Sequence, residues 1–184
     1  MKNLKNFSFL SNLEKMSKIQ LINDVLSPHF KSEEPNLAEE STSMSIELVK
    51  DRCTSIVFKL DKQLSSEYKG GIFPFFDRTK SKVCKVCDYI IFAEFKNTLF
   101  ALIIELKKGN QDTGPQLKAG ECFAQFVIAT VNRVNNSNYQ LEMRKVSIKE
   151  YRRKRKTKIR DIEYDSKGHH VFDQQKLRVV SFLK

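Results

Sequence analysis

Two acidic residues and one lysine stand at the ends of two neighbouring apolar segments. Asp88 opens the segment DYIIF, and Glu105 and Lys107 close the segment ALIIELK. Charged groups at the ends of segments this apolar are unusual, because an unpaired buried charge is costly. Carboxylates bind hard divalent cations, and an ammonium group can stabilise charge on a phosphate. We therefore predict a chemical site here, the alternative being an exposed strand end with Asp88 paired to Lys85 or Lys107.

The two apolar segments, 84–93 and 98–107, have the composition of β-strands and are separated by a polar break at Glu94–Asn97. If the chain reverses at the centre of this break, Asp88 lies opposite Glu105 on the same face of the hairpin. A slip of one residue would turn Asp88 toward the apolar face. Because two adjacent carboxylates repel each other, we expect a divalent cation, Mg²⁺ or Mn²⁺, between them.

The same residues resemble a known family of enzymes. Asp88, followed 17 positions later by the triplet Glu-Leu-Lys that ends at Lys107, is similar to the motif of the PD-(D/E)XK nuclease superfamily, which has the restriction-endonuclease-like fold. The resemblance covers about residues 44–134. It implies that Asp88 and Glu105 bind Mg²⁺ and that Lys107 assists the attacking water. The chain departs from the family motif at Cys87, where the name-giving residue is Pro.

The resemblance also implies further site residues and a function. Some members carry a Gln on the helix that follows the sheet, where Gln116 stands in this chain, and others a Glu before the sheet, for which Glu47 is the candidate metal ligand and Glu40 the weaker alternative. The implied activity is Mg²⁺-dependent hydrolysis of phosphodiester bonds in DNA, or in RNA. Family analogy further suggests a homodimer or a partner protein, and a place in a bacterial defence or mobile-element system.

The rest of the chain must position this site, and its hydrophobic spacing predicts the elements. In chain order these are a helix over 1–27, a polar loop over 31–43, a helix over 44–64, the two strands, a helix over 116–134 that follows Pro115, a strand over 139–148, a hairpin over 162–172 around Lys167-Gly168, and a last strand over 177–183. The predicted inward face of the third helix comprises Gln116, Gly120, Phe123, Val127, Val131 and Val134.

This order predicts an α/β (α+β) domain with a restriction-endonuclease-like αβββαβ core and one central mixed sheet. A helical segment, 1–30, would precede a nuclease-like domain, 44–184, that contains a basic β insertion at 144–165. The amphipathic segment 1–27 could instead dock a partner protein, which would make the chain an adaptor.

Positive charge is concentrated near the end of the chain. The net charge is +11, and residues 144–184 hold 14 Lys and Arg against 5 Asp and Glu. Such a run favours a polyanionic partner, the alternative being a solvated loop. A non-catalytic nucleic-acid-binding subunit is therefore the second hypothesis. The predicted contacts are Arg144, Lys145, Lys149, Arg152, Arg153, Lys154, Arg155, Lys156, Lys158 and Arg160, and Tyr151 could stack on a base.

No secretion signal or membrane-length apolar run is visible, so we expect a cytoplasmic protein with reduced thiols and no membrane association. Cys84 and Cys87 are spaced as in zinc sites, but no second such pair occurs, and a buried thiol at Cys87 is the plainer interpretation. His169 and His170 are predicted to be exposed polar residues in a turn, the alternative being a catalytic role.

Overall fold

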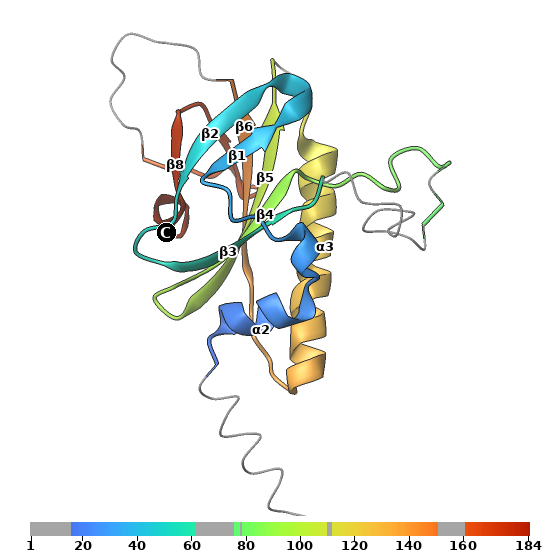
Figure 1. The fold of residues 1–184 in the computed structure, drawn as a ribbon, viewed down its shortest axis with the longest axis vertical. Helices are drawn as coiled ribbons and strands as arrows, with labels where there is room; N and C mark the ends of the chain where they lie inside the picture. The colour runs from blue at the N-terminus through green and yellow to red at the C-terminus, as the bar shows by residue number, and fades with distance from the viewer. Residues whose placement is uncertain (1–15, 62–75, 78, 110–111, 151–160) are drawn as a thin grey trace, which may run out of the picture.

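The computed structural model describes residues 16–61, 76–77, 79–109, 112–150 and 161–184 (Figure 1). These residues form a mixed α/β fold with two α-helices and eight strands in two mixed sheets. The elements are α2 (Lys18–Val25), β1 (Asn36–Glu39), β2 (Met44–Val49), β3 (Thr54–Lys59), β4 (Tyr89–Phe95), β5 (Thr98–Lys107), α3 (Gly114–Asn135), β6 (Glu142–Lys149), β7 (His169–Phe172) and β8 (Lys176–Arg178), with 3₁₀ turns at Pro28–Phe30, Glu40–Thr42 and Val179–Phe182.

The larger sheet has the order β3-β4-β5-β6-β7 and the smaller one the order β1-β2-β8. In the larger sheet, β3, β4 and β5 are antiparallel, whereas β6 and β7 run parallel to β5. One face of this sheet packs against the smaller sheet, through residues such as Leu102, Ile104 and Leu177. The other face packs against α2 and α3, through residues such as Ile103 and Val127 (Figure 1). The chain thus builds three layers, with β4 and β5 in the middle.

The β4–β5 hairpin is the central prediction that the structure confirms. Tyr89 pairs with Ile104 and Phe95 with Thr98, which is the predicted register. Lys96 and Asn97 have φ values of 48° and 65°, in the left-handed region that a tight two-residue hairpin turn requires. The register therefore follows from a local turn joining two strongly apolar strands.

The predicted helix over 44–64 is wrong. Residues 44–59 form the strands β2 and β3, joined by a turn in which Arg52 has a φ of 61°. Within β2, the buried residues Ile46 and Leu48 alternate with exposed ones, which is the period of a strand. The helix is predicted because apolar residues recur every 3–4 positions from Val49 through Cys53 and Ile56 to Leu60. This spacing arises because the end of β2 and the start of β3 follow each other closely in the sequence. The pairing of β2 with β1 and β8 stabilises a strand here instead of a helix. The sequence does not predict β1, and β8 lies far from β2 in the sequence.

The termini also differ from the prediction. Two sheets replace the single predicted sheet, because β1, inside the predicted loop 31–43, pairs with β2. The turn around Lys167-Gly168 is present, with Gly168 at a φ of 67°, but β7 pairs with β6 and residues 161–165 are not a strand. The predicted last strand, 177–183, is the short β8 followed by a 3₁₀ turn. Of the predicted helix over 1–27, residues 1–15 lie outside the described part, and α2 is the rest.

Helix α3 presses closely on the β4–β5 hairpin. Its buried residues include Gly120, Val127 and Val131, as predicted, but the face is rotated so that Val134 is 57% exposed. The face is completed by Leu117, Ala124 and Ile128. A Cβ atom on Gly120 would lie 2.5 Å from both the Sγ atom of Cys87 and the Cγ2 atom of Ile103. Glycine is therefore required for this approach of helix and sheet.

We expect Gly120→Ala to lower the free energy of unfolding by about 1–3 kcal/mol, the usual cost of overpacking a dense core. The better helix propensity of Ala, about 1 kcal/mol, offsets part of the strain. Urea denaturation of the full chain measures the change. Gln125→Ala, on the exposed side of α3, is the control and should stay within about 0.5 kcal/mol of the parent. An unchanged stability for Gly120→Ala would show that α3 can move away from the sheet at no cost.

Candidate metal centre

The predicted carboxylates, Asp88 and Glu105, both lie at the same end of the β4–β5 hairpin, and burial together with the charge of Glu105 raises the pKa of Asp88. Asp88 immediately precedes β4, and its Oδ2 atom accepts a hydrogen bond of 2.6 Å from the backbone N–H of Leu106. The carbonyl oxygen of Asp88 accepts a second bond, of 2.8 Å, from the N–H of Leu60. These bonds tie Asp88 to the strands on both sides. Asp88 and Glu105 are 4% and 1% exposed, so both belong to the core and not to a solvated strand end.

Lys107 is held by one of these carboxylates. Its Nζ atom lies 3.0 Å from the Oε1 atom of Glu105, and its side chain is 23% exposed. The other carboxylate oxygen of Glu105, Oε2, is buried and has no hydrogen-bond partner among the residues that the structure describes. A buried carboxylate oxygen without a donor is costly, and a cation would satisfy it.

Two further carboxylates form a group with Asp88 that does not include Glu105. Glu39, Asp61 and Asp88 each place one carboxylate oxygen within 4.8 Å of the other two, an arrangement that could hold a metal ion. Glu39 ends β1, which the hydroxyl of Tyr89 fixes by donating to the carbonyl oxygen of Ala38 at 2.8 Å and accepting from its N–H at 2.9 Å. Asp61 lies two residues after the end of β3. The sequence signal for Asp61 is its place just after the apolar segment that ends at Leu60.

Burial and mutual repulsion change the acidity of these groups. Burial, followed by the charge of Glu105, raises the pKa of Asp88 from 3.8 to about 7. Burial also raises the pKa of Glu105, against the opposing effect of Lys107. Burial alone would lower the pKa of Lys107, but its hydrogen bond to Glu105 and the surrounding carboxylates raise it, so Lys107 remains an ammonium ion. Carboxylates that resist ionisation in the absence of a cation are characteristic of functional sites.

No family model, curated protein or solved structure matches the chain. Within the described residues, no helix is both long enough and apolar enough to span a bilayer. The molecule is therefore characterised by its own geometry: a mixed α/β fold with an acidic Glu39/Asp61/Asp88 group that could hold a metal ion.

The two residues assigned only by resemblance lie differently. Glu47 is on β2, where it is exposed and its carboxylate is 2.8 Å from the Nζ atom of Lys176. It is not part of the acidic group, in which Glu39 supplies the carboxylate from the N-terminal part of the chain. The weaker alternative, Glu40, begins the 3₁₀ turn after Glu39. Gln116 is partly buried in the first turn of α3, and its Oε1 atom is buried without a hydrogen-bond partner in the described part of the chain.

Three of the predicted basic contacts lie on β6 in the described part of the chain, each in a different environment. Arg144 is engaged structurally, with its guanidinium 5.4 Å from the ring of Phe100 and 5.3 Å from that of Tyr164. Lys145 lies 3.5 Å from the carboxylate of Glu121 on α3. Lys149 is partly buried on β6, where it pairs in register with Lys107. The remaining predicted contacts, Arg152, Arg153, Lys154, Arg155, Lys156, Lys158 and Arg160, and Tyr151 lie outside the described residues.

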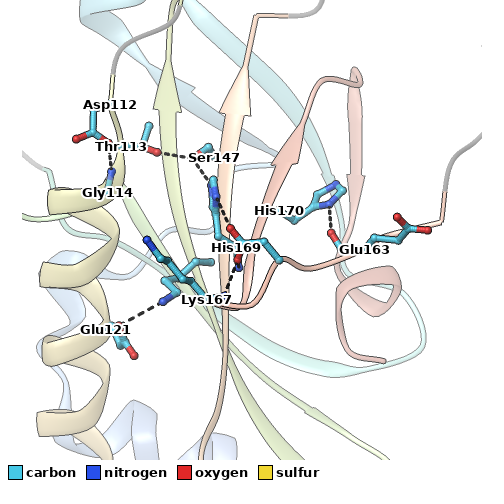
Figure 2. Close-up of polar contacts among 11 residues, drawn as sticks. Asp112, Thr113, Gly114, Glu121, Ser147, Glu163, Lys167, His169 and His170 are labelled. Atoms are coloured by element: carbon cyan, nitrogen blue, oxygen red, sulfur yellow. Dashed lines mark hydrogen bonds and ion pairs between the residues drawn. The ribbon is translucent and has the colours of Figure 1, made fainter.

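The histidines and the CxxC pair have other surroundings. Cys87 is fully buried as predicted, and burial raises the pKa of its thiol far above the usual range. The two histidines are not exposed turn residues, because both are partly buried on β7. His170 lies against the rings of Tyr164 and Phe182, and its Nδ1 atom is 2.7 Å from the carbonyl oxygen of Glu163 (Figure 2). His169 contacts Ser147, which the sequence did not indicate as important.

Proposed function

We propose that this protein is a metal-dependent nuclease of the PD-(D/E)XK type that hydrolyses phosphodiester bonds in DNA. The observation that carries the proposal is that Asp88 and Glu105 are both buried at one end of the β4–β5 hairpin, with the Nζ atom of Lys107 3.0 Å from Glu105. The unpartnered Glu105 oxygen and the oxygen-only donor set suit a hard cation such as Mg²⁺ or Mn²⁺. The net charge of +11 supports a polyanionic substrate.

Each residue has a role that follows from its position. Asp88 and Glu105 would hold the cation, with Glu39 and Asp61 as additional carboxylates on the Asp88 side. When bound, a divalent cation polarises a phosphate and lowers the pKa of a coordinated water. Because its pKa is raised, Lys107 keeps its proton and would act as a charged hydrogen-bond donor and not as a base: it can orient the attacking water or stabilise negative charge on the phosphate.

A binding-only module is the competing hypothesis, and the described residues give it less support. Arg144 and Lys145, which would belong to its nucleic-acid surface, contact neighbouring side chains of the fold. A binding module also has no use for two buried carboxylates at one end of a hairpin, since their repulsion and desolvation lower stability. The metal centre explains this arrangement, and a basic surface alone does not.

Incubation of the full chain with supercoiled plasmid DNA tests the proposal. We expect nicked or linear products with Mg²⁺ or Mn²⁺ and none with excess EDTA, and a parallel reaction on RNA defines the substrate. Lys107→Met should reduce cleavage by about 10²–10³-fold, the usual cost of removing a group that stabilises transition-state charge. Salt-dependent DNA binding without cleavage in either metal would favour the binding module instead.

A further inference from the structure

A chain of polar contacts lies one strand away from Glu105 and connects three elements. Ser147 on β6 pairs in register with Glu105 on β5, so both side chains point to the face that α3 covers. The Oγ atom of Ser147 is 2.5 Å from the Oγ1 atom of Thr113 and 2.7 Å from the Nε2 atom of His169 (Figure 2). Ser147 is 1% exposed, so this contact is internal to the fold.

Asp165 fixes the outer end of this chain of polar contacts, at His169. The Oδ1 atom of Asp165 accepts backbone hydrogen bonds from Lys167 at 2.8 Å and from His169 at 2.9 Å. Its Oδ2 atom lies 3.9 Å from the Nδ1 atom of His169. The imidazole is thereby held between a carboxylate and the hydroxyl of Ser147. Ser147, His169 and Asp165 are the residue types of a hydrolytic triad. The Ser147 hydroxyl is nevertheless not available to attack a substrate, because it is buried and lies within hydrogen-bond distance of both Thr113 and His169.

At its inner end, this chain of polar contacts uses the side chain of Thr113, the residue at the N-cap position of α3. Thr113 occupies the N-cap position of α3, yet its side chain makes no capping hydrogen bond. Its hydroxyl faces Ser147 instead, and the carboxylate of Asp112 accepts the N–H of Gly114 at 2.9 Å (Figure 2). An N-cap hydrogen bond stabilises the first turn of a helix. The Thr113 hydroxyl is thus committed to the sheet at the level of Glu105 and not to its own helix.

We propose that Ser147 and His169 are positioning residues of the candidate metal centre, which act through Thr113 to hold the first turn of α3 at the level of Glu105. That turn carries Gln116, whose amide oxygen is buried without a partner among the described residues. A second contact, between Lys145 and Glu121, ties β6 to α3 one to two turns further along. The inference rests on the proposed nuclease function and assigns to it two residues that touch neither carboxylate in the described contacts.

Isosteric removal of the hydroxyls tests this role. Thr113→Val and Ser147→Ala should each lower the turnover number for plasmid cleavage about tenfold, in line with outer-shell substitutions, with KM for DNA unchanged. Mn²⁺ affinity, measured by calorimetry, should also be unchanged, because the carboxylates lie on other strands. Thr113→Ser keeps the hydroxyl and should keep the parent turnover. His169→Gln still offers an amide to Ser147. Its turnover number should therefore be higher than that of His169→Ala.

Matched controls separate positioning from general destabilisation. Thr130→Val removes a hydroxyl that donates to the carbonyl oxygen of Phe126 within α3, and Ser55→Ala removes a hydroxyl on β3, away from this chain of contacts. Both should cleave as the parent does. All assays run well below the thermal midpoint of each variant.

The outcomes distinguish the two proposals. If the parent cleaves and Thr113→Val and Ser147→Ala match its turnover despite lower thermal midpoints, the polar chain is structural and this inference fails alone. A fall in Mn²⁺ affinity in the same variants also contradicts it, because the centre itself would have been disturbed. An inactive parent protein overturns the nuclease proposal, and this inference with it.

Discussion

Asp88→Asn and Glu105→Gln are each expected to lower the Mg²⁺-dependent cleavage rate by about 10³-fold or more, since a cation contributes several kcal/mol to transition-state stabilisation. Both substitutions keep the shape of the side chain and remove the negative charge. The Asn oxygen can still accept the Leu106 N–H, so the fold should persist. Single-turnover cleavage and Mn²⁺ titration of the same samples give the two measurements.

Glu47 supplies the matched control, and Glu39 supplies a second test of the site. Glu47→Gln removes a carboxylate that forms an exposed ion pair with Lys176, and it should cleave within about twofold of the parent because such pairs contribute little. Glu39→Gln removes a member of the acidic group and should weaken Mn²⁺ binding measurably. Unchanged cleavage by Asp88→Asn and Glu105→Gln would refute the site. Loss of activity in Glu47→Gln alone would restore the ligand assignment based on resemblance.

The core of this site could be predicted because it depends on local information. Asp88 and Glu105 lie in one hairpin, whose two-residue turn and apolar strands determine which residues face each other. Once that register is set, alternation of side chains brings Lys107 to the same face. Pro115 at the start of α3 marks the next element equally well.

The rest of the site depends on contacts between distant segments. Glu39 reaches Asp88 because Tyr89 holds β1, and no spacing in the sequence reveals that bond between residues 51 positions apart. The apolar residues of β2 and β3, on either side of the turn at Arg52, together have helical spacing. Asp61 therefore falls inside a predicted helix and is not identified as a site residue. Ser147 and His169 come together only through the parallel pairing of β6 with β7. Periodicity identifies faces, and it does not identify partners.

The buried carboxylates also predict that the metal-free protein is destabilised by its own site. The pKa of Asp88 is about 7, against 3.8 for an ordinary Asp side chain. Between these values the folded protein keeps a proton that the unfolded chain releases. Stability from this group is therefore present below about pH 4 and is lost as the pH rises through about 7. At 1.36 kcal/mol per pH unit the loss is about 4 kcal/mol as an upper bound.

Asp88→Asn has no such group, so without metal it should become more stable than the parent as the pH rises from about 4 to about 8, by up to about 4 kcal/mol. Urea denaturation in EDTA across this range measures the gap. Adding Mg²⁺ should stabilise the parent at about pH 8 and leave Asp88→Asn unchanged, because ligand binding to the folded state adds to its stability. If Asp88→Asn is instead the less stable protein in EDTA at about pH 8, then Asp88 is ionised and satisfied without a cation. A carboxylate that lowers the stability of the metal-free protein and raises the stability of the metal-bound protein is retained for metal binding. These two opposite effects distinguish a metal ligand from a buried structural carboxylate.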